Sequence, residues 1–114
     1  MSTVTIGVST PDEASERFIR AWETGESQGS HIGFASLEDL WKTLTIKRWE
    51  ILKVMTGAGP LAIREIARRL DRDVKGVHGD VQALLNAGLL DKTGDGKIVF
   101  PYDEVRVDFV LKAA

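Results

Sequence analysis

Basic and amide side chains recur at helical spacing between residues 64 and 82, and two more lysines follow in a short turn region. Lysine and arginine neutralise phosphates and bond to guanine, and glutamine can pair with two edge atoms of adenine. This combination predicts contact with double-stranded DNA rather than bond-making chemistry. The candidate DNA-binding residues are Arg64, Arg68, Arg69, Arg72, Lys75, His78, Gln82, Lys92 and Lys97.

These candidates fall into groups with different expected roles. The candidates for reading bases are Arg72, Lys75, His78 and Gln82, and the alternative for this face is an ordinary solvated helix surface. Arg64, Arg68 and Arg69 are expected either to contact phosphates or simply to keep the surface soluble. Lys92 and Lys97 are expected either to contact the minor groove or adjacent phosphates, or to be ordinary exposed lysines of a hairpin. Gly76 and Gly79 lie on the base-reading face and each costs a helix about 0.5–1 kcal/mol relative to alanine. They either allow close approach to the DNA backbone or mark weakened recognition.

Catalytic and metal-binding patterns are absent from the sequence. His31 and His78 are the only histidines and do not stand at a metal-ligand spacing, and there is no cysteine. The Gly-Ala-Gly-Pro run at residues 57–60 lacks the lysine and serine of a phosphate-binding loop. We therefore expect a protein that is not an enzyme, with no metal and no cofactor.

Three helices and a hairpin are expected to position the basic residues. The helices are predicted at about 46–56, 62–70 and 74–87, with Thr45 and Asp73 as N-caps and Gly88 ending the third. The third helix is expected to bury Val74, Val77, Val81, Leu84 and Leu85. Residues 89–93 and 97–100 flank Gly-Asp-Gly, a strong signal for a tight hairpin. This order predicts an α+β fold with a winged helix-turn-helix at residues 45–100.

The flanking segments carry two strands and an N-terminal helix. Residues 1–44 are predicted to form a strand-helix extension that serves dimerisation or support. It contains a helix capped by Thr10 that continues to about Thr24, a second short strand at 31–35 and a helix capped by Ser36. Residues 101–114 are predicted to form a C-terminal strand that pairs with the N-terminal one, in the same chain or in a second copy. The tryptophans are expected to pack in the core: Trp22, Trp41 and Trp49.

The charge is unevenly distributed along the chain. The net charge is −2 overall, but residues 45–100 hold 10 basic and 7 acidic residues, a net +3, whereas residues 1–44 hold 3 basic and 7 acidic residues, a net −4. Positive charge therefore falls on the segment expected to touch phosphate. There is no apolar run long enough for a membrane span and no signal-peptide pattern, so a cytoplasmic protein is expected.

Eight runs spread over most of the chain form a recognisable pattern: Leu44–Glu50, Gly57–Leu61, Arg64–Leu70, Asp73–Lys75, Val77–His78, Asp80–Val81, Ala83–Leu85 and Pro101–Asp108. This pattern resembles a family of predicted bacterial and archaeal winged-helix regulators that is broadly MarR-like. The resemblance implies DNA binding and a dimer. Members often look like the antitoxin or regulator half of a two-gene toxin–antitoxin unit, which implies a cognate toxin as partner and repression of the unit's own promoter. The third helix of such proteins usually carries larger charged residues where Gly76 and Gly79 stand here.

The sequence thus predicts a homodimeric, sequence-specific DNA-binding transcriptional regulator, with an autorepressing antitoxin as its expected biological setting. The alternative is a winged-helix module for protein interaction, which binds a toxin or other partner without reading DNA. Overall acidity and the two glycines of the third helix favour that alternative. Replacing Lys75 and His78 by alanine would separate the two. If DNA binding is lost and partner binding stays intact, the regulator is favoured.

Overall fold

A computed structural model describes residues 2–8, 11–24 and 30–110 of the chain. The described residues form an α+β fold with five helices, a three-stranded sheet and a two-stranded hairpin. The elements are β1 (Thr3–Val8), α1 (Pro11–Thr24), β2 (Ser30–Phe34), α2 (Leu37–Thr43), α3 (Ile46–Met55), α4 (Ile63–Leu70), α5 (Val74–Asn86), β3 (Asp91–Lys92), β4 (Ile98–Val99) and β5 (Glu104–Asp108). No helix among these is long and apolar enough to cross a membrane.

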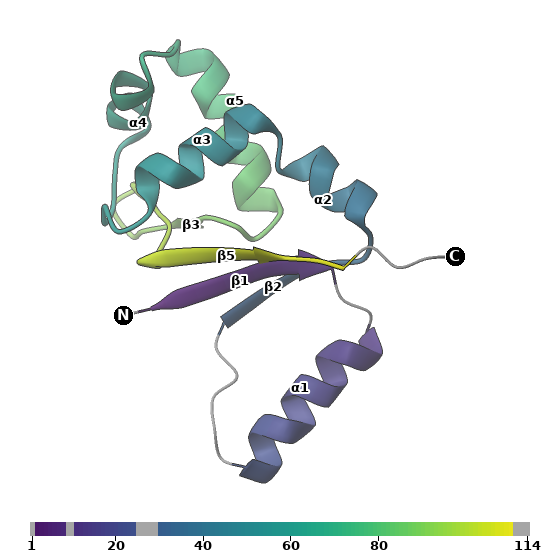
Figure 1. The fold of residues 1–114 in the computed structure, drawn as a ribbon. Coiled ribbons are helices and arrows are strands. Elements are labelled where there is room, and N and C mark those ends of the chain that lie inside the picture. Colours follow the sequence, from purple (N-terminus) through teal and green to yellow (C-terminus); the bar gives the residue numbers. More distant parts are fainter. Residues whose placement is uncertain (1, 9–10, 25–29, 111–114) are drawn as a thin grey trace.

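The three-stranded sheet joins the two ends of the chain. Its order is β2-β1-β5, and both pairings are parallel, with Ile6 opposite Ile32 on one side and Val107 on the other. The terminal strands therefore pair within this chain. Of the strand predicted at 101–114, the described part contains only Glu104–Asp108, and residues 111–114 lie outside the described residues. Val4 and Ile6 are fully buried, whereas the intervening residues of β1 are less so. Figure 1 shows α2 to α5 on one side of this sheet and α1 on the other.

Side-chain caps begin three of the helices where the sequence predicts them. The hydroxyl of Ser36 accepts a bond from the Asp39 N–H at 3.1 Å, and that of Thr45 accepts one from the Arg48 N–H at 3.3 Å. The Asp73 carboxylate accepts the Gly76 N–H at 3.1 Å and so caps α5. These bonds satisfy backbone donors that have no partner inside the helix. The capping predictions for Ser36, Thr45 and Asp73 are confirmed, and the predicted cap Thr10 lies outside the described residues.

The hairpin β3–β4 follows α5 as predicted. Gly88 ends α5 with φ 80°, and Gly96 completes the hairpin turn with φ 84°, both in the left-handed region that favours glycine. The segment between α3 and α4 joins the hairpin, because Leu61 and Ile98 exchange two backbone hydrogen bonds of 2.8 Å each. The hairpin is thus tied to the entrance of α4 as well as to the end of α5.

One hydrophobic core connects the sheet, the helices and the hairpin. Buried side chains from each region belong to it, among them Ile6, Leu52, Ile66, Leu84 and Phe100. The predicted burial of Val77, Val81 and Leu84 in α5 is confirmed, and Leu85 is half-buried. Val74 is 43% exposed, so its predicted burial is wrong; it stands in the first turn of α5.

The prediction that all three tryptophans pack in the core is wrong for two of them. Trp49 is half-buried and packs against the core, but Trp41 is 53% exposed and Trp22 is 81% exposed. Trp22 lies on the amphipathic helix α1. The sheet face opposite to that of Val4 and Ile6 carries threonine, glycine and charged residues, which give the apolar side of α1 little to pack against. Trp41 lies beside β5, where its ring meets Phe109 edge-on at 5.8 Å.

Candidate nucleic-acid interface

The outward side of α5 is a continuous stripe of exposed residues. Lys75, His78 and Gln82 lie at positions i, i+3 and i+7 and are all exposed. Residues at this spacing share one face of a helix. The opposite side of α5 is fixed by the buried Val77 and Val81. The structure therefore brings three of the four candidate base-reading residues onto one solvent-facing surface.

These three side chains have few ties to the rest of the protein. Lys75 and His78 form no hydrogen bond or ion pair through their side chains within the described part of the chain, and Gln82 Nε2 donates to Asn86 Oδ1 at 3.3 Å. No acidic side chain neutralises Lys75 there. The stripe is consequently available for an external partner.

The two glycines on this side of α5 are not required by the protein's interior. A Cβ placed on Gly79 would meet no atom within 4 Å. At Gly76 it would lie 3.6 Å from Arg72 Nη2 and 3.8 Å from Asp73 Oδ2, which are ordinary contact distances. Neither glycine has a positive φ. Packing and backbone geometry therefore do not explain why this helix carries glycine twice.

Two of the three α4 arginines share one carboxylate. Arg68 and Arg69 both bind Glu65, the second with Nε at 3.0 Å from Oε1, and their side chains remain 72% and 40% exposed. The hydrogen bond from Arg68, followed by that from Arg69, lowers the pKa of Glu65 to about 2. Arg64 is exposed. With three arginines and one glutamate, α4 keeps a net charge of +2 at neutral pH.

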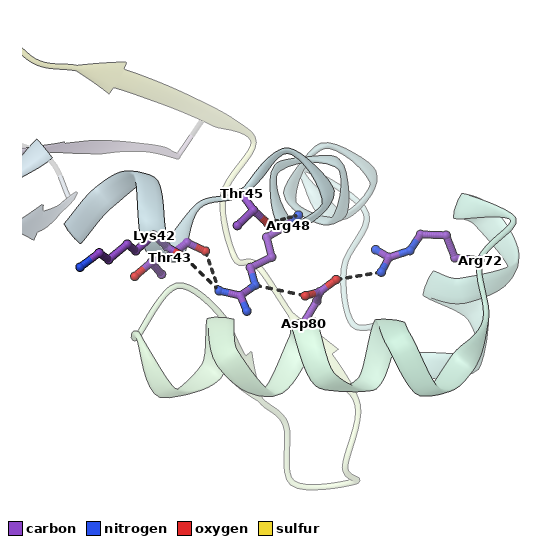
Figure 2. A network of polar contacts seen from close by, with 6 residues as sticks. All are labelled: Lys42, Thr43, Thr45, Arg48, Arg72 and Asp80. Carbon is purple, nitrogen blue, oxygen red and sulfur yellow. Dashed lines mark hydrogen bonds and ion pairs between the residues drawn. The ribbon is translucent and has the colours of Figure 1, made fainter. Parts of the chain in front are cut away.

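Arg72 points toward Asp80 on α5 (Figure 2), so it is not part of the exposed stripe. Its Nη2 donates to Asp80 Oδ2 at 2.8 Å, and its side chain is only 22% exposed. Asp80 also accepts a bond from Arg48 Nε at 3.1 Å through its other carboxylate oxygen. The candidate base reader Arg72 is thus engaged in holding the α4–α5 turn against α5.

Arg48 extends this polar network to the end of α2. Its Nη1 donates to the carbonyl oxygen of Thr43 at 3.0 Å and approaches that of Lys42 at 3.5 Å. Burial raises the pKa of the Asp80 carboxyl, but the hydrogen bonds from Arg72 and Arg48 outweigh this and hold the pKa below its ordinary value. One charged network therefore fastens α5 to α3, α2 and the preceding turn (Figure 2).

Sequence reasoning assigned no role to Arg48 and Asp80. The sequence feature that could have indicated this role is the position of Asp80 between Val77 and Val81. It places a carboxylate at the border of the buried side of α5. A carboxylate at such a border requires a cationic or hydrogen-bonding partner. The partner's identity depends on tertiary contact, because Arg48 lies 32 positions away in the chain.

Both lysines of the hairpin, Lys92 and Lys97, are exposed beside a hydrogen-bonded turn. The Asp95 carboxylate accepts the Thr93 hydroxyl and, at 3.3 Å, the Lys97 N–H. These bonds, the Thr93 one first, hold the pKa of Asp95 below its ordinary value. The turn thereby fixes the backbone from which Lys92 and Lys97 project.

The described residues contain no group of three histidine, cysteine, aspartate or glutamate side chains that could hold a metal ion. Among known protein families, the sequence model named HVO_A0114 matches residues 43–107, which is more than half of the chain. The match begins at the last residue of α2 and ends within β5, so it covers every candidate DNA-binding residue. No curated protein matches the sequence.

Proposed function

This chain belongs to the HVO_A0114 family, and we propose that it is a sequence-specific DNA-binding transcriptional regulator. The observation that carries this proposal is the exposed stripe of Lys75, His78 and Gln82, whose helix is locked in place on its other side. A rigid helix that offers cationic and amide groups to solvent suits the major groove, whose base edges bond such groups.

In this proposal α3 to α5 and the hairpin act as a winged helix-turn-helix. Helix α5 enters the major groove, and the arginines of α4 contact phosphates on one side of it. Lys92 and Lys97 contact the backbone or the minor groove from the hairpin, which serves as the wing. Arg72 positions α5 through Asp80 and does not read a base.

The proposed regulator acts as a homodimer. Two copies would present two α5 helices to half-sites about 34 Å apart, one turn of DNA. The MarR-like resemblance further supports a regulator that represses its own promoter as the antitoxin of a two-gene unit, with the toxin as a protein partner. In that setting the DNA next to its own gene is the first sequence to test.

The test is fluorescence anisotropy of labelled DNA from upstream of the gene, titrated with protein between about 50 and 200 mM salt. Unlabelled upstream DNA and unrelated DNA of equal length serve as competitors. We expect specific binding whose log affinity falls steeply with log salt, because several phosphates are neutralised. Binding that is equally weak for both DNAs would refute sequence-specific recognition.

A second candidate function is protein interaction without DNA reading. The observation in its favour is the apolar side of α1, where Phe18, Ile19 and Trp22 are 71%, 51% and 81% exposed. Apolar clusters of this kind mark surfaces that contact another protein. The partner in this case would be a toxin or other protein encoded by the neighbouring gene.

Two variants separate these functions in a pulldown with the neighbouring gene product. Under the second candidate, Trp22→Ala weakens capture of that protein and Lys75→Ala leaves capture unchanged, while the wild type shows no preference for its own upstream DNA. This candidate would be rejected if neither the wild type nor Trp22→Ala captures the neighbouring gene product and both bind the upstream DNA specifically.

A further inference from the structure

The free edge of β5 is a surface that neither the core nor the proposed DNA contacts use. Among the described strands, β5 pairs only with β1, so its other edge exposes backbone N–H and C=O groups. Proteins usually cover or block such an edge, because it can accept another strand. This edge contains no proline within Glu104–Asp108, and its charged side chains alternate with valines.

Apolar side chains gather beside this edge. Val107 is one wall of a hollow of about 410 Å³ between β5 and the helices α2 and α3. The remaining lining residues are Leu40, Trp41, Leu44, Thr45, Ile46 and Trp49. The exposed fractions are 83% for Ile46, 40% for Phe109 and 75% for Val110. The open edge and the apolar hollow therefore form one continuous unfilled surface, which we call the β5 edge surface.

We propose that a second copy of this chain covers the β5 edge surface, with the two β5 strands antiparallel across a two-fold axis. The two sheets would then join into one, in the order β2-β1-β5-β5-β1-β2. A two-fold interface uses the same patch on both copies, and only antiparallel pairing of a strand with itself satisfies that symmetry. The inference rests on the homodimer of the proposed function and assigns its interface.

The charged and apolar side chains of β5 together select how the two strands align. Val105 packs against the core and Val107 lines the hollow, so Arg106 and Asp108 lie on the opposite face of the sheet. When Val107 faces Val107 of the second copy, Arg106 faces Asp108 of that copy, and the reverse pair forms as well. Neither Arg106 nor Asp108 has a hydrogen bond or ion pair through its side chain in the described part of the chain.

Other alignments are less favourable. Centring the pair on Arg106 places like charges opposite one another, which destabilises antiparallel strands. Centring it on Val105 also pairs Arg106 with Glu104 of the second copy, but it places Val107 opposite Asp103 of that copy and leaves Phe109 beyond the apolar face. A shift by one residue would turn valines toward the charged face. With Val107 at the centre, Val105 faces Phe109 of the second copy, and the apolar residues remain together.

The decisive test is sedimentation equilibrium, without DNA, of two charge-reversed variants alone and mixed. In Arg106→Asp both cross-strand pairs become Asp–Asp, and in Asp108→Arg both become Arg–Arg. We expect the dimer dissociation constant to rise at least about tenfold in each variant. In an equal mixture both pairs are Asp–Arg again, so heterodimers should form with nearly wild-type affinity. Lys53→Glu, a reversal on α3, is the control that should leave dimerisation unchanged.

Cysteine substitution tests the alignment directly, since the chain has no cysteine of its own. Opposed Cβ atoms in antiparallel strands lie about 4.5–5.5 Å apart. Mild oxidation should therefore link Val107→Cys to itself, and Val105→Cys should remain unlinked. A monomeric wild type, mixed charge variants that stay monomeric, or preferential linking of Val105→Cys would overturn the proposal.

The outcomes distinguish this interface from the proposed function. A dimer that shows the expected variant behaviour but ignores upstream DNA would retain the interface and reject the regulator. If the protein binds upstream DNA specifically but Arg106→Asp and Asp108→Arg do not change its dimerisation, the proposed function stands and the interface is rejected.

Discussion

Asp80 connects the polar network to the proposed DNA-reading helix. It accepts hydrogen bonds from Arg72 and Arg48, and side-chain exposures of 19–24% shield this triad only partly from water. Arg72 Nη1 is buried without a hydrogen-bond partner among the described residues, so the triad is not completely satisfied. Removing the Asp80 charge would leave Arg48 and Arg72 half-buried without an anionic partner. The free-energy cost of these unpaired charges exceeds the net stabilisation that the ion pairs provide.

Asp80→Asn should lower the free energy of unfolding by about 1.5–3 kcal/mol at pH 7. Because the folded-state pKa of Asp80 is depressed, its contribution is present above its unfolded pKa and is lost as pH falls through the folded one. The difference between wild type and variant should therefore shrink below about pH 4. Urea unfolding of both proteins from pH 7 to pH 2.5 measures this. The depressed pKa of Glu65 affects both proteins alike. A difference that stays constant would contradict the assignment.

Gly79→Ala tests whether the glycine serves an external partner. Since a Cβ there meets open space, the substitution should stabilise the protein by about 0.5–1 kcal/mol through helix propensity. If the DNA backbone approaches Gly79 closely, affinity for upstream DNA should fall several-fold although stability rises. Thermal unfolding and anisotropy on the same sample separate the two effects. Unchanged affinity would show that Gly79 is simply exposed.

At the scale of elements, local sequence signals predicted where helices and the hairpin begin and end, whereas the orientation of individual side chains depended on tertiary contacts. Capping residues and glycines fixed the starts and ends of α3, α5 and the hairpin, because these depend on neighbouring backbone groups. The inward turn of Arg72 was not predictable, because its spacing also fits an exposed face and only Asp80 decides otherwise. The exposure of Trp22 likewise depends on what the facing sheet offers.

The hairpin should contribute DNA affinity without sequence preference. Lys92→Ala and Lys97→Ala should each weaken binding to specific and unrelated DNA by similar factors, and should reduce the slope of log affinity against log salt by about 1. Competition anisotropy at several salt concentrations provides both quantities. Asp91→Ala, next to Lys92 on the exposed β3, serves as the neighbouring control and should not reduce that slope. A specific loss for upstream DNA alone would mean that the wing reads bases.

The whole molecule separates positive and negative charge. Residues 45–100 carry a net +3, whereas residues 1–44 carry −4 and include β1, α1, β2 and α2. Such separation orients a protein on DNA, with the acidic part turned away from phosphate. The sequence predicted the α+β class and the pairing of the terminal strands, but that β5 is an edge strand of the described sheet follows only from the strand order β2-β1-β5.

The central claim, that the outward side of α5 contacts DNA, is tested most directly by one matched pair of variants. Lys75→Ala and Lys53→Ala each remove one positive charge, the first from the exposed side of α5 and the second from α3, which packs against the other side of α5. Anisotropy on upstream DNA across salt should show weaker binding and a slope reduced by about 1 for Lys75→Ala, and wild-type values for Lys53→Ala. Equal behaviour of the two variants would contradict the account.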